Sequence, residues 1–464
     1  MHIVEIPYRD PFGAFQACSA AAHCAFLDSA AAGDPRARFS YIAADPFQVI
    51  TSDAAGVRVD GVAVAASPFQ ALARALAAHR LPAAPGPVPF RSGAIGYLGY
   101  ELGRHLERLP PPRPADPPLP EMVMGLYDTV VAFDHAAARA FILASGAPER
   151  GDGARRARAR RRADELKERL EAAPAAAPAP DWTLRGTFRP ERPRAEVEAA
   201  IARVIEYIRA GDIFQANLTQ QMRARVPQGL GDLALYARLR ALSPSPFAAF
   251  LRCGADISVL SASPERFLSL APDGRVETRP IKGTRPRGAD AAEDAALAAA
   301  LLASEKDRAE NLMIVDLLRN DLSRVSQVGS VKVPALCALE TFASVHHLVS
   351  VVESRLQPGL GPVDLLEACF PGGSITGAPK IRAMEIIHEL ETAPRGVYCG
   401  SVAWIGFDGA MDSSIVIRTI TQAGDTLLTQ AGGGIVADSD PVDEYEESLV
   451  KLAPMLRALS GEGR

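Results

Sequence analysis

Three glutamates have positions that suit the binding of a divalent cation. Glu310 lies in the middle of an expected helix beside an apolar run, and Glu444 and Glu447, three residues apart, share one face of a second expected helix. Carboxylates on inward-turned helix faces are costly unless a partner neutralises them. Mg²⁺ would do so with a few carboxylate ligands, while keeping positions for water or a substrate carboxylate. Surface charges or ordinary ion pairs are the alternative interpretation.

Two glycine-rich segments and one arginine favour a small polycarboxylate as ligand. We expect PGGSITGAPKIRAMEII to be a loop that opens into a helix with Pro379 at its first position. Backbone N–H groups there, together with Thr376 and Lys380, would attract an anion. AGGGIVADSDP is expected to be a second loop; neither segment matches a nucleotide-binding loop, and each alone could be a tight turn. Arg418, on an expected strand over 414–420, needs a carboxylate partner in the protein or on a ligand.

Lys282 is a candidate nucleophile in the segment ETRPIKGTRPRG. It follows an expected strand, precedes a glycine, and has Arg279 and Arg285 on either side. Burial or nearby positive charge lowers the pKa of a lysine, and the neutral amine is nucleophilic. A surface cation among arginines is the alternative.

The elements that must position these residues come in mixed runs. The apolar spacing predicts helices over 196–209, 304–320 and 441–456, the second with Ser304 and Asp307 as a capping box. Strands are expected over 257–261, 276–280 and 414–420. Because strands and helices do not alternate steadily, we expect an α+β fold with antiparallel sheets.

A basic stretch followed by an Ala/Pro-rich segment divides the chain near residues 145–182. We expect an N-terminal α+β region over 1–150, a basic helix and linker over 151–185, and a C-terminal catalytic region over 186–464. Eight Lys or Arg lie between Ala154 and Glu171, against four Asp or Glu. This stretch is expected to be a solvated helix leading into a linker, and a patch for an acidic partner is the alternative.

The composition excludes several classes of protein. The chain has 464 residues, a formal charge of −5 and 48% hydrophobic residues, so nothing favours nucleic acid or an anionic membrane as partner. None of the six cysteines forms a CxxC pair, and no apolar run reaches 18 residues. The first residues carry charges where a signal peptide needs an apolar stretch. We therefore expect a cytoplasmic protein that does not bind nucleic acid or membranes.

Five segments occur in an order that resembles the signature motifs of the chorismate-utilising enzymes. They are SASPERF, TRPIKGTRPRG, KDRAENLMIVDLLRNDL, PGGSITGAPK and AGGGIVADSDP…EYEESLVK. Three further segments, HCAFLDSA, RFSYIAADP and RSGAIGYLGYELGR, resemble matching parts of the amine-transferring members. The resemblance covers nearly the whole chain outside 145–182, and it outweighs the alternatives given for each motif alone.

Two positions favour amination among the reactions of this family. Lys282, in PIKGT, resembles the lysine of aminodeoxychorismate synthases, whereas anthranilate synthases typically carry alanine there. Gln215, in GDIFQANL, stands where the isochorismate and salicylate enzymes carry a lysine that activates water. Glutamine cannot act as a base, so the resemblance implies that ammonia attacks chorismate. Anthranilate synthase component I is the nearest alternative.

The resemblance implies two intertwined α+β halves, with stacked antiparallel sheets flanked by helices, and an active site in the C-terminal half. Lys282 is implied to form a covalent bond to chorismate, and Glu265 to protonate the departing 4-hydroxyl. His347, in SVHHLVS, matches the family's active-site histidine. The implied substrate-binding residues are Arg418, Tyr398, Thr376, Gly432, Gly433, Gly434 and Lys451, with Gln215 beside them.

The resemblance also implies a cofactor and partners. Mg²⁺ is expected on Glu310 and Glu447, with Glu444 as a ligand through water. A separate glutaminase subunit is expected to supply ammonia, because the chain shows no glutaminase segment. Tryptophan is a candidate ligand of the N-terminal half, although AFLDS differs from the LLES segment usual in feedback-inhibited anthranilate synthases. A non-catalytic, tryptophan-sensing protein on this fold is the alternative from another class.

Overall fold

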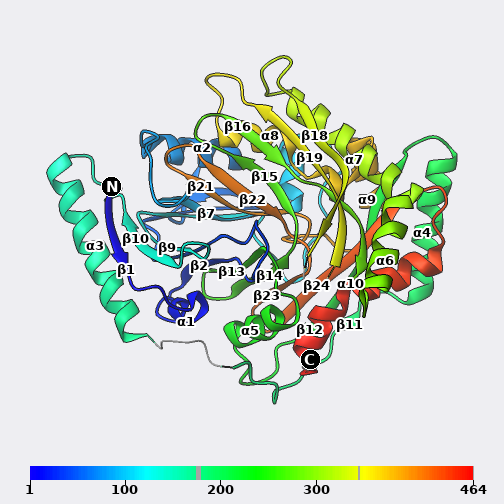
Figure 1. Cartoon of the computed structure of the whole chain (residues 1–464), viewed down its shortest axis with the longest axis horizontal. Helices are drawn as coiled ribbons and strands as arrows, with labels where there is room; N and C mark the ends of the chain where they lie inside the picture. The colour runs from blue at the N-terminus through cyan, green and yellow to red at the C-terminus, as the bar shows by residue number, and fades with distance from the viewer. Residues whose placement is uncertain (174–178, 343–344, 463–464) are drawn as a thin grey trace.

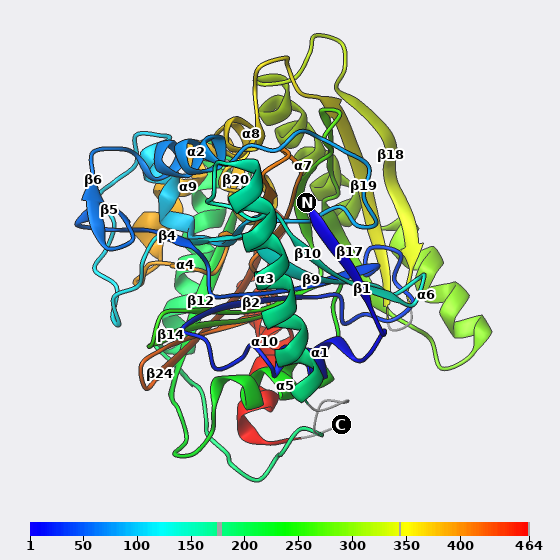
Figure 2. The same ribbon diagram turned by 90° about the vertical axis from the view of Figure 1, so that its left-hand side faces the viewer.

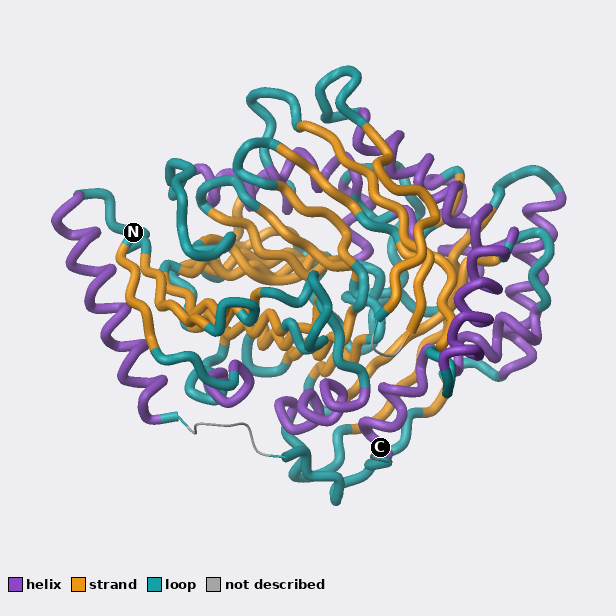
Figure 3. Tube along the Cα trace, in the orientation of Figure 1, coloured by secondary structure: helices purple, strands orange, loops and turns teal. Residues whose placement is uncertain are grey.

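The computed structural model describes residues 1–173, 179–342 and 345–462 (Figure 1). Within these residues the strands form two sheets of twelve strands each. Strands gather in the centre of the molecule and helices lie towards its periphery (Figure 3). The helical elements are α1 (Pro11–Phe15), α2 (Pro68–Ala78), η1 (Tyr100–His105), α3 (Asp152–Ala172), α4 (Arg194–Arg209), α5 (Asp232–Leu242), α6 (Ala291–Ala303), α7 (Glu305–Ser323), α8 (Pro362–Cys369), η2 (Gly373–Ile375), α9 (Lys380–Leu390) and α10 (Pro441–Ser460).

The first sheet joins strands from both ends of the chain. Its order is β1 (His2–Ile6), β10 (Arg139–Ala144), β9 (Thr129–Asp134), β3 (Phe39–Ala44), β2 (His23–Asp28), β13 (Phe247–Cys253), β14 (Ile257–Ser263), β23 (Thr419–Ala423), β24 (Thr426–Ile435), β12 (Gln215–Arg225) and β11 (Arg189–Pro190), with β20 (Gly377–Ala378) beside β12. The N-terminal β2 pairs antiparallel with β13, so that Ala25 lies opposite Leu251.

The second sheet mixes the two parts of the chain in the same way. Its order is β17 (Ile281–Pro286), β19 (Val345–Arg355), β16 (Arg275–Thr278), β15 (Arg266–Leu270), β22 (Met411–Ile415), β21 (Ser401–Gly406), β7 (Gly93–Leu98), β8 (Met122–Tyr127), β4 (Gln48–Asp53), β5 (Gly56–Val59) and β6 (Val62–Val64), with β18 (Lys332–Thr341) beside β19. Here β21 pairs antiparallel with the N-terminal β7. The expected α+β fold of two intertwined halves is confirmed, and the exact domain limits stay a prediction.

Three apolar layers hold this arrangement together. Between the sheets, Tyr41 and Val130 of the first sheet pack with Ile95 and Trp404 of the second. Helices α1, α3, α5 and α10 cover the outer face of the first sheet, and α2, α7 and α8 cover that of the second. Each fully buried aromatic or large aliphatic side chain, such as Phe26, stabilises the fold by roughly 1.5–3 kcal/mol through removal from water.

The helices predicted from periodicity are confirmed, and three local predictions are wrong. The expected strand over 414–420 is broken, because β22 ends at Ile415 in the second sheet and β23 begins at Thr419 in the first. Gly432–Gly434 lie inside strand β24 rather than in a loop. Pro379 is the residue before helix α9 and not its first residue. In the first two cases the sheet crossing or the pairing of strands overrides the local sequence signal.

The basic stretch forms helix α3, which is not simply solvated. Its Ala159, Ala163, Leu166 and Leu170 are buried, and the helix lies against β10 and β1 (Figure 2). Arg158 and Arg162 pair with the fully buried carboxylate of Asp128 at 2.9 and 3.3 Å. Removal of one partner would leave an uncompensated buried charge, so these arginines anchor the helix. Residues 174–178 of the expected linker lie outside the described residues.

None of the helices in the described part of the chain is long and apolar enough to span a membrane.

Candidate active site

Lys282 and Glu310 meet at the edge of the second sheet. Lys282 lies in β17, and its Nζ is 4.0 Å from Oε2 of Glu310 on α7. Both side chains are largely buried, with 14% and 13% exposed. Helix α7 is fixed in this place by the Ser304 cap, whose hydroxyl accepts from Asp307 N–H, and by buried residues that face the sheet. Burial raises the pKa of Glu310, and the charges of Lys282 and Lys306 oppose that shift.

Each of the three predicted metal ligands faces a lysine. Besides the Lys282–Glu310 pair, Lys306 lies 3.3 Å from Glu444 Oε1, and Lys451 lies 2.7 Å from Glu447 Oε1. Burial raises the pKa of Glu447, but the nearby lysines outweigh it and the net pKa lies below its usual value. The lysines therefore neutralise the carboxylates that the sequence marks as costly.

The donor chemistry of the three glutamates fits a hard cation, since all their donors are carboxylate oxygens. The charges of Glu310, Glu444 and Glu447 all act on Lys306, so the three acids lie around a common centre. In the described residues, however, no three His, Cys, Asp or Glu side chains are arranged closely enough to form a metal site as they stand. A cation would bind here in competition with the lysines.

The three glycines of β24 place the first sheet against these charges. Gly432, Gly433 and Gly434 pair with Thr219, Leu218 and Asn217 of β12. A Cβ on Gly433 would lie 2.9 Å from Glu444 Oε2 and 3.6 Å from Lys451 Nζ. Lys451 also donates to the carbonyl of Gly432 at 2.8 Å. Glycine is required because any side chain would fill the space that the charged groups now line.

Gln215 and Lys282 converge on Gly434. A Cβ on Gly434 would lie 1.9 Å from Gln215 Nε2 and 3.4 Å from Lys282 Nζ. Gln215 is 1% exposed, and its Oε1 is a buried acceptor with no hydrogen-bond partner among the described residues. Buried polar atoms are normally paired, so an unpaired one beside a candidate nucleophile is the mark of a place where a ligand binds.

Glu265 and Arg418 lie where the chain crosses between the two sheets. Glu265 connects β14 of the first sheet to β15 of the second, and Arg418 immediately precedes β23 on the return crossing. The crossings are tied together by a hydrogen bond from Ile415 N–H to the Glu265 carbonyl at 3.1 Å. Arg418 has a left-handed backbone with φ of 51°. Strain of this kind is tolerated where the surrounding structure fixes it, often at functional sites.

Burial sets the protonation of this second group of residues. It raises the pKa of Glu265, against the opposing influence of Ser374 and of the cations Lys282, Arg36 and Arg418. Burial also lowers the pKa of Arg418. For His347 it lowers the pKa to about 4, with Arg36 and Arg418 acting in the same direction. At neutral pH His347 is therefore an uncharged imidazole, and Thr284 Oγ1 lies 2.8 Å from its Nδ1.

Arg36 is a residue of this site that the sequence did not indicate. It lies in the loop between β2 and β3, paired with Asp34 at 2.7 Å, and its side chain is 9% exposed. Its guanidinium stands 4.5 Å above the ring of Phe342, whose ring lies 5.6 Å from that of His347. No motif marks an arginine in this loop, so only the three-dimensional packing reveals that the N-terminal part reaches His347.

For the remaining predicted residues the structure shows only contacts with other parts of the protein. Thr376 is fully buried and donates through Oγ1 to the carbonyl of Gly372 at 3.0 Å. Tyr398 packs in the core of the second sheet, near Arg395. Lys380 pairs with Asp321 at 2.6 Å, so it is not free to attract an anion as expected. Contact of Thr376 and Tyr398 with a substrate stays a prediction.

A family model described as chorismate binding enzyme matches residues 22–457. The chain belongs to the chorismate binding enzymes. An aminodeoxychorismate synthase component 1 from Klebsiella aerogenes is 44% identical over 85% of this chain and 83% of its own length. An anthranilate synthase component 1 from Streptomyces coelicolor is 43% identical over 84% and 77%. The crystal structure of anthranilate synthase component I from Streptococcus pneumoniae TIGR4 matches with a TM-score of 0.78 at 34% identity, over 90% of this chain and 92% of that one.

An aminodeoxychorismate synthase component 1 and an anthranilate synthase component 1 are thus about equally similar to this chain. Overall identity does not separate them, and the residues of the site must do so.

Proposed function

We propose that this chain aminates chorismate at C4 to give 4-amino-4-deoxychorismate, the precursor of 4-aminobenzoate in folate synthesis. The observation that carries the proposal is the position of Lys282, an amine beside Gly434, Gln215 and Glu310 at the centre of the site. The similarity to curated aminodeoxychorismate synthases supports the same reaction.

Lys282 would open the reaction as a nucleophile. Its neutral amine adds to C2 of chorismate, both conjugated ring double bonds shift, to C1=C6 and C4=C5, and the C4–O bond breaks. The proton of Glu265 goes to the leaving hydroxyl, which departs as water. Burial raises the pKa of Glu265 and so keeps this proton available. Two allylic displacements replace one difficult direct substitution, which is the general advantage of covalent catalysis.

Ammonia would complete the reaction. It adds at C4, both double bonds return to their original positions, and the C2–N bond breaks with its electron pair returning to Lys282. The new ammonium group then gives a proton to the Glu265 carboxylate, so chorismate and ammonia yield 4-amino-4-deoxychorismate and water. Gln215 has no basic atom, which disfavours activation of water at the same place.

Mg²⁺ is proposed as the cofactor, held by Glu310 and Glu447 and through water by Glu444. It would supply a positive charge for the ring carboxylate of chorismate. Arg418, the Gly432–Gly434 backbone and Lys451 would bind the rest of the dianion, with Thr376 and Tyr398 beside them.

A separate subunit is proposed as the source of ammonia. The relatives are named as first components, which supports a second component for this chain. A glutaminase fits the chemistry, because glutamine hydrolysis supplies ammonia directly to the site.

A cavity between the sheets is the proposed place for tryptophan. It has a volume of about 380 Å³ and is lined by aromatic residues that include Tyr41, Phe247 and Trp404. Arg36 lines it too, so an occupant would lie next to the Arg36–Phe342–His347 stack.

Product identification tests the proposal. The purified chain is incubated with chorismate, Mg²⁺ and ammonium, with and without a chelator, and the product is identified by mass and absorbance. We expect 4-amino-4-deoxychorismate, loss of turnover in chelator, and recovery with Mg²⁺. Formation of anthranilate and pyruvate would replace the proposal with anthranilate synthesis. Tryptophan binding without chorismate turnover would identify a sensing protein instead.

A further inference from the structure

Arg395 is a buried guanidinium behind the candidate active site. Its side chain is 1% exposed and pairs with Glu391 at 2.7 Å. Its Nη1 donates to the carbonyl of Ile375 at 2.7 Å, and its Nη2 donates to the carbonyl of Asn217 at 2.5 Å. Ile375 directly precedes Thr376, and Asn217 lies two residues after Gln215. One side chain therefore holds the backbone next to two of the proposed substrate-binding residues.

The other contacts of Arg395 strengthen the link to β12 and connect it to two further segments, β24 and η1. Glu391, its acidic partner, also accepts from the backbone N–H and the hydroxyl of Thr219 on β12, both at 2.9 Å. Gln430, on the same strand as the three glycines, donates to the Arg395 carbonyl at 3.1 Å. The Tyr100 ring stacks on the guanidinium at 4.6 Å. Glu101 of η1 accepts from the backbone N–H of Arg395 at 2.9 Å.

We propose that Arg395 is a positioning residue for chorismate binding, which clamps η2, β12 and β24 in the register that the substrate requires. The proposal rests on the proposed substrate site at Thr376, Gln215 and the glycines of β24. A planar fork with five donors reaches two carbonyls and a carboxylate at once, whereas a lysine ammonium reaches them only singly. Loss of the fork frees the Ile375 and Asn217 carbonyls to move.

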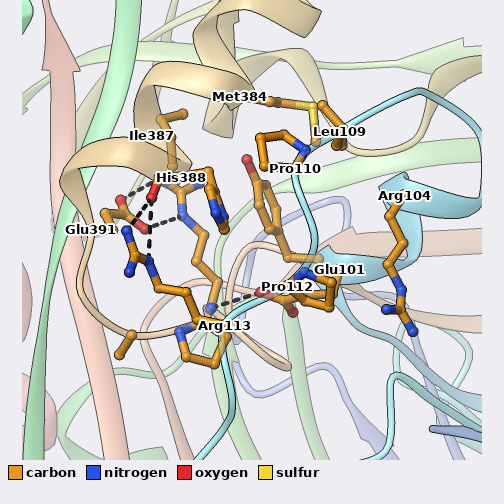
Figure 4. A pocket seen from close by; sticks show the side chains of 14 residues that line it. Glu101, Arg104, Leu109, Pro110, Pro112, Arg113, Met384, Ile387, His388 and Glu391 are labelled. Carbon is orange, nitrogen blue, oxygen red and sulfur yellow. Dashed lines mark hydrogen bonds and ion pairs between the residues drawn. The ribbon is translucent and has the colours of Figure 1, made fainter. Parts of the chain in front are cut away.

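A pocket opens onto this clamp (Figure 4). Glu101, Met384, His388 and Glu391 line it, together with Arg395 itself. In Figure 4 the Pro-rich segment with Pro110, Pro112 and Arg113 covers one wall, and Arg113 donates to the carbonyl of His388 at 2.9 Å. The pocket gives a small cation a route to the space that a shortened side chain at 395 would leave.

Arg238 offers a matched control within the same chain. It is fully buried and also clamps backbone carbonyls, donating to Asp181 at 2.5 Å and to Leu184 at 2.7 Å. It stacks on Trp182 at 5.6 Å, as Arg395 stacks on Tyr100. The carbonyls that it holds belong to residues 181–184 and 458, which are not part of the site. A general loss of stability from weakening a buried arginine clamp should therefore appear in both variants.

The experiment compares Arg395→Lys with Arg238→Lys in the full chain. Steady-state kinetics with chorismate and thermal unfolding are measured for both variants and the unchanged protein. We expect both substitutions to lower the unfolding temperature, and only Arg395→Lys to raise KM for chorismate, by about tenfold or more, the scale set by lost charge-assisted hydrogen bonds. Arg395→Ala should recover part of its chorismate affinity when millimolar guanidinium is added, and Arg238→Ala should recover none.

Equal KM values for the unchanged protein and Arg395→Lys would overturn the positioning role. If Arg395→Lys does not fold, Glu391→Gln replaces it, because it keeps the acceptor for Thr219 and removes the ion pair. An unchanged KM in Glu391→Gln would overturn the role as well. A protein that binds chorismate but makes a product other than 4-amino-4-deoxychorismate would contradict the proposed function alone, and the KM comparison would still decide the role of Arg395.

Discussion

Lys282 Nζ lies 4.0 Å from Glu310 Oε2, so the candidate nucleophile faces a candidate metal ligand across the gap between β17 and α7. The two roles are linked by this pair. An added cation that binds Glu310 would compete with Lys282 for the carboxylate.

Lys282→Ala should therefore remove amination while chorismate still binds. The substitution deletes the amine and leaves the binding groups in place, so kcat should fall to background with little change in affinity. Product formation and chorismate binding are measured on the same preparation, and a chorismate-derived mass is sought on Lys282 in the unchanged enzyme. Full activity of Lys282→Ala would exclude the covalent role.

Glu265→Gln should lower the rate by about two to four orders of magnitude, the usual contribution of a positioned general acid. The amide keeps the shape but has no proton to give. The pH profile supplies a second measurement. Because burial raises the pKa of Glu265, the protonated form persists to higher pH than in a free glutamate, and the rate should fall as pH rises through that raised value. A loss confined to KM would contradict general-acid catalysis.

The sequence predicts which candidate residues lie close together better than it predicts their backbone conformations. Motif order supplied Lys282, Glu265 and the three glutamates, and apolar spacing supplied the helices that carry them. The sequence did not show that Arg418 lies between two strands of different sheets. A continuous hydrophobic run predicts one strand, whether or not the chain passes from one sheet to the other near Ile417. The three glycines suggested a loop, and only pairing with β12 shows why a strand needs them.

Long-range contacts account for what the sequence could not predict. Arg36 and His347 are more than three hundred residues apart, and no periodicity relates them. The role of Arg395 could not be predicted for the same reason. Its partners Ile375, Asn217 and Gln430 come together only when β12, η2 and β24 pack against one another. The spacing of residues along the sequence predicts single helices and strands, whereas Arg36 and Arg395 contact residues of several elements that are distant in the sequence.

Arg36→Ala should raise the pKa of His347 above its value of about 4, because it removes one of the two cations that disfavour the imidazolium. The pKa should stay below 6.5, since burial and Arg418 remain. Histidine-selective labelling and NMR titration measure it. Arg139→Ala is the control, because Arg139 also pairs with an acid, Glu5, and stacks on Phe141 at 4.9 Å, but on the surface. Equal His347 titrations in both variants would contradict the stacked arrangement.

The protonation of the cysteines indicates whether this chain could release ammonia from glutamine. Release of ammonia from glutamine needs an activated nucleophile, usually a cysteine thiolate. Burial raises the pKa of Cys18 to about 11 and of Cys24 and Cys399 to about 12, and it also raises the pKa of Cys253 and Cys369. Cys253 lies opposite His23 in the β13–β2 pair, yet desolvation keeps its thiol protonated. These thiols are poor nucleophiles.

This chain alone should accordingly use ammonium salts and not glutamine. At a fixed total concentration of ammonium its rate should rise with pH until loss of the Glu265 proton offsets the gain, because free NH₃ is the nucleophile and its share of total ammonia grows. Addition of a glutaminase subunit should confer glutamine use and weaken the pH dependence, since ammonia then reaches the site directly. The measurement is a paired assay at fixed chorismate, with glutamine or ammonium as nitrogen source, and with or without the second subunit. Efficient amination from glutamine by the purified single chain would mean that it carries a glutaminase activity of its own, and the proposed division of labour would be wrong.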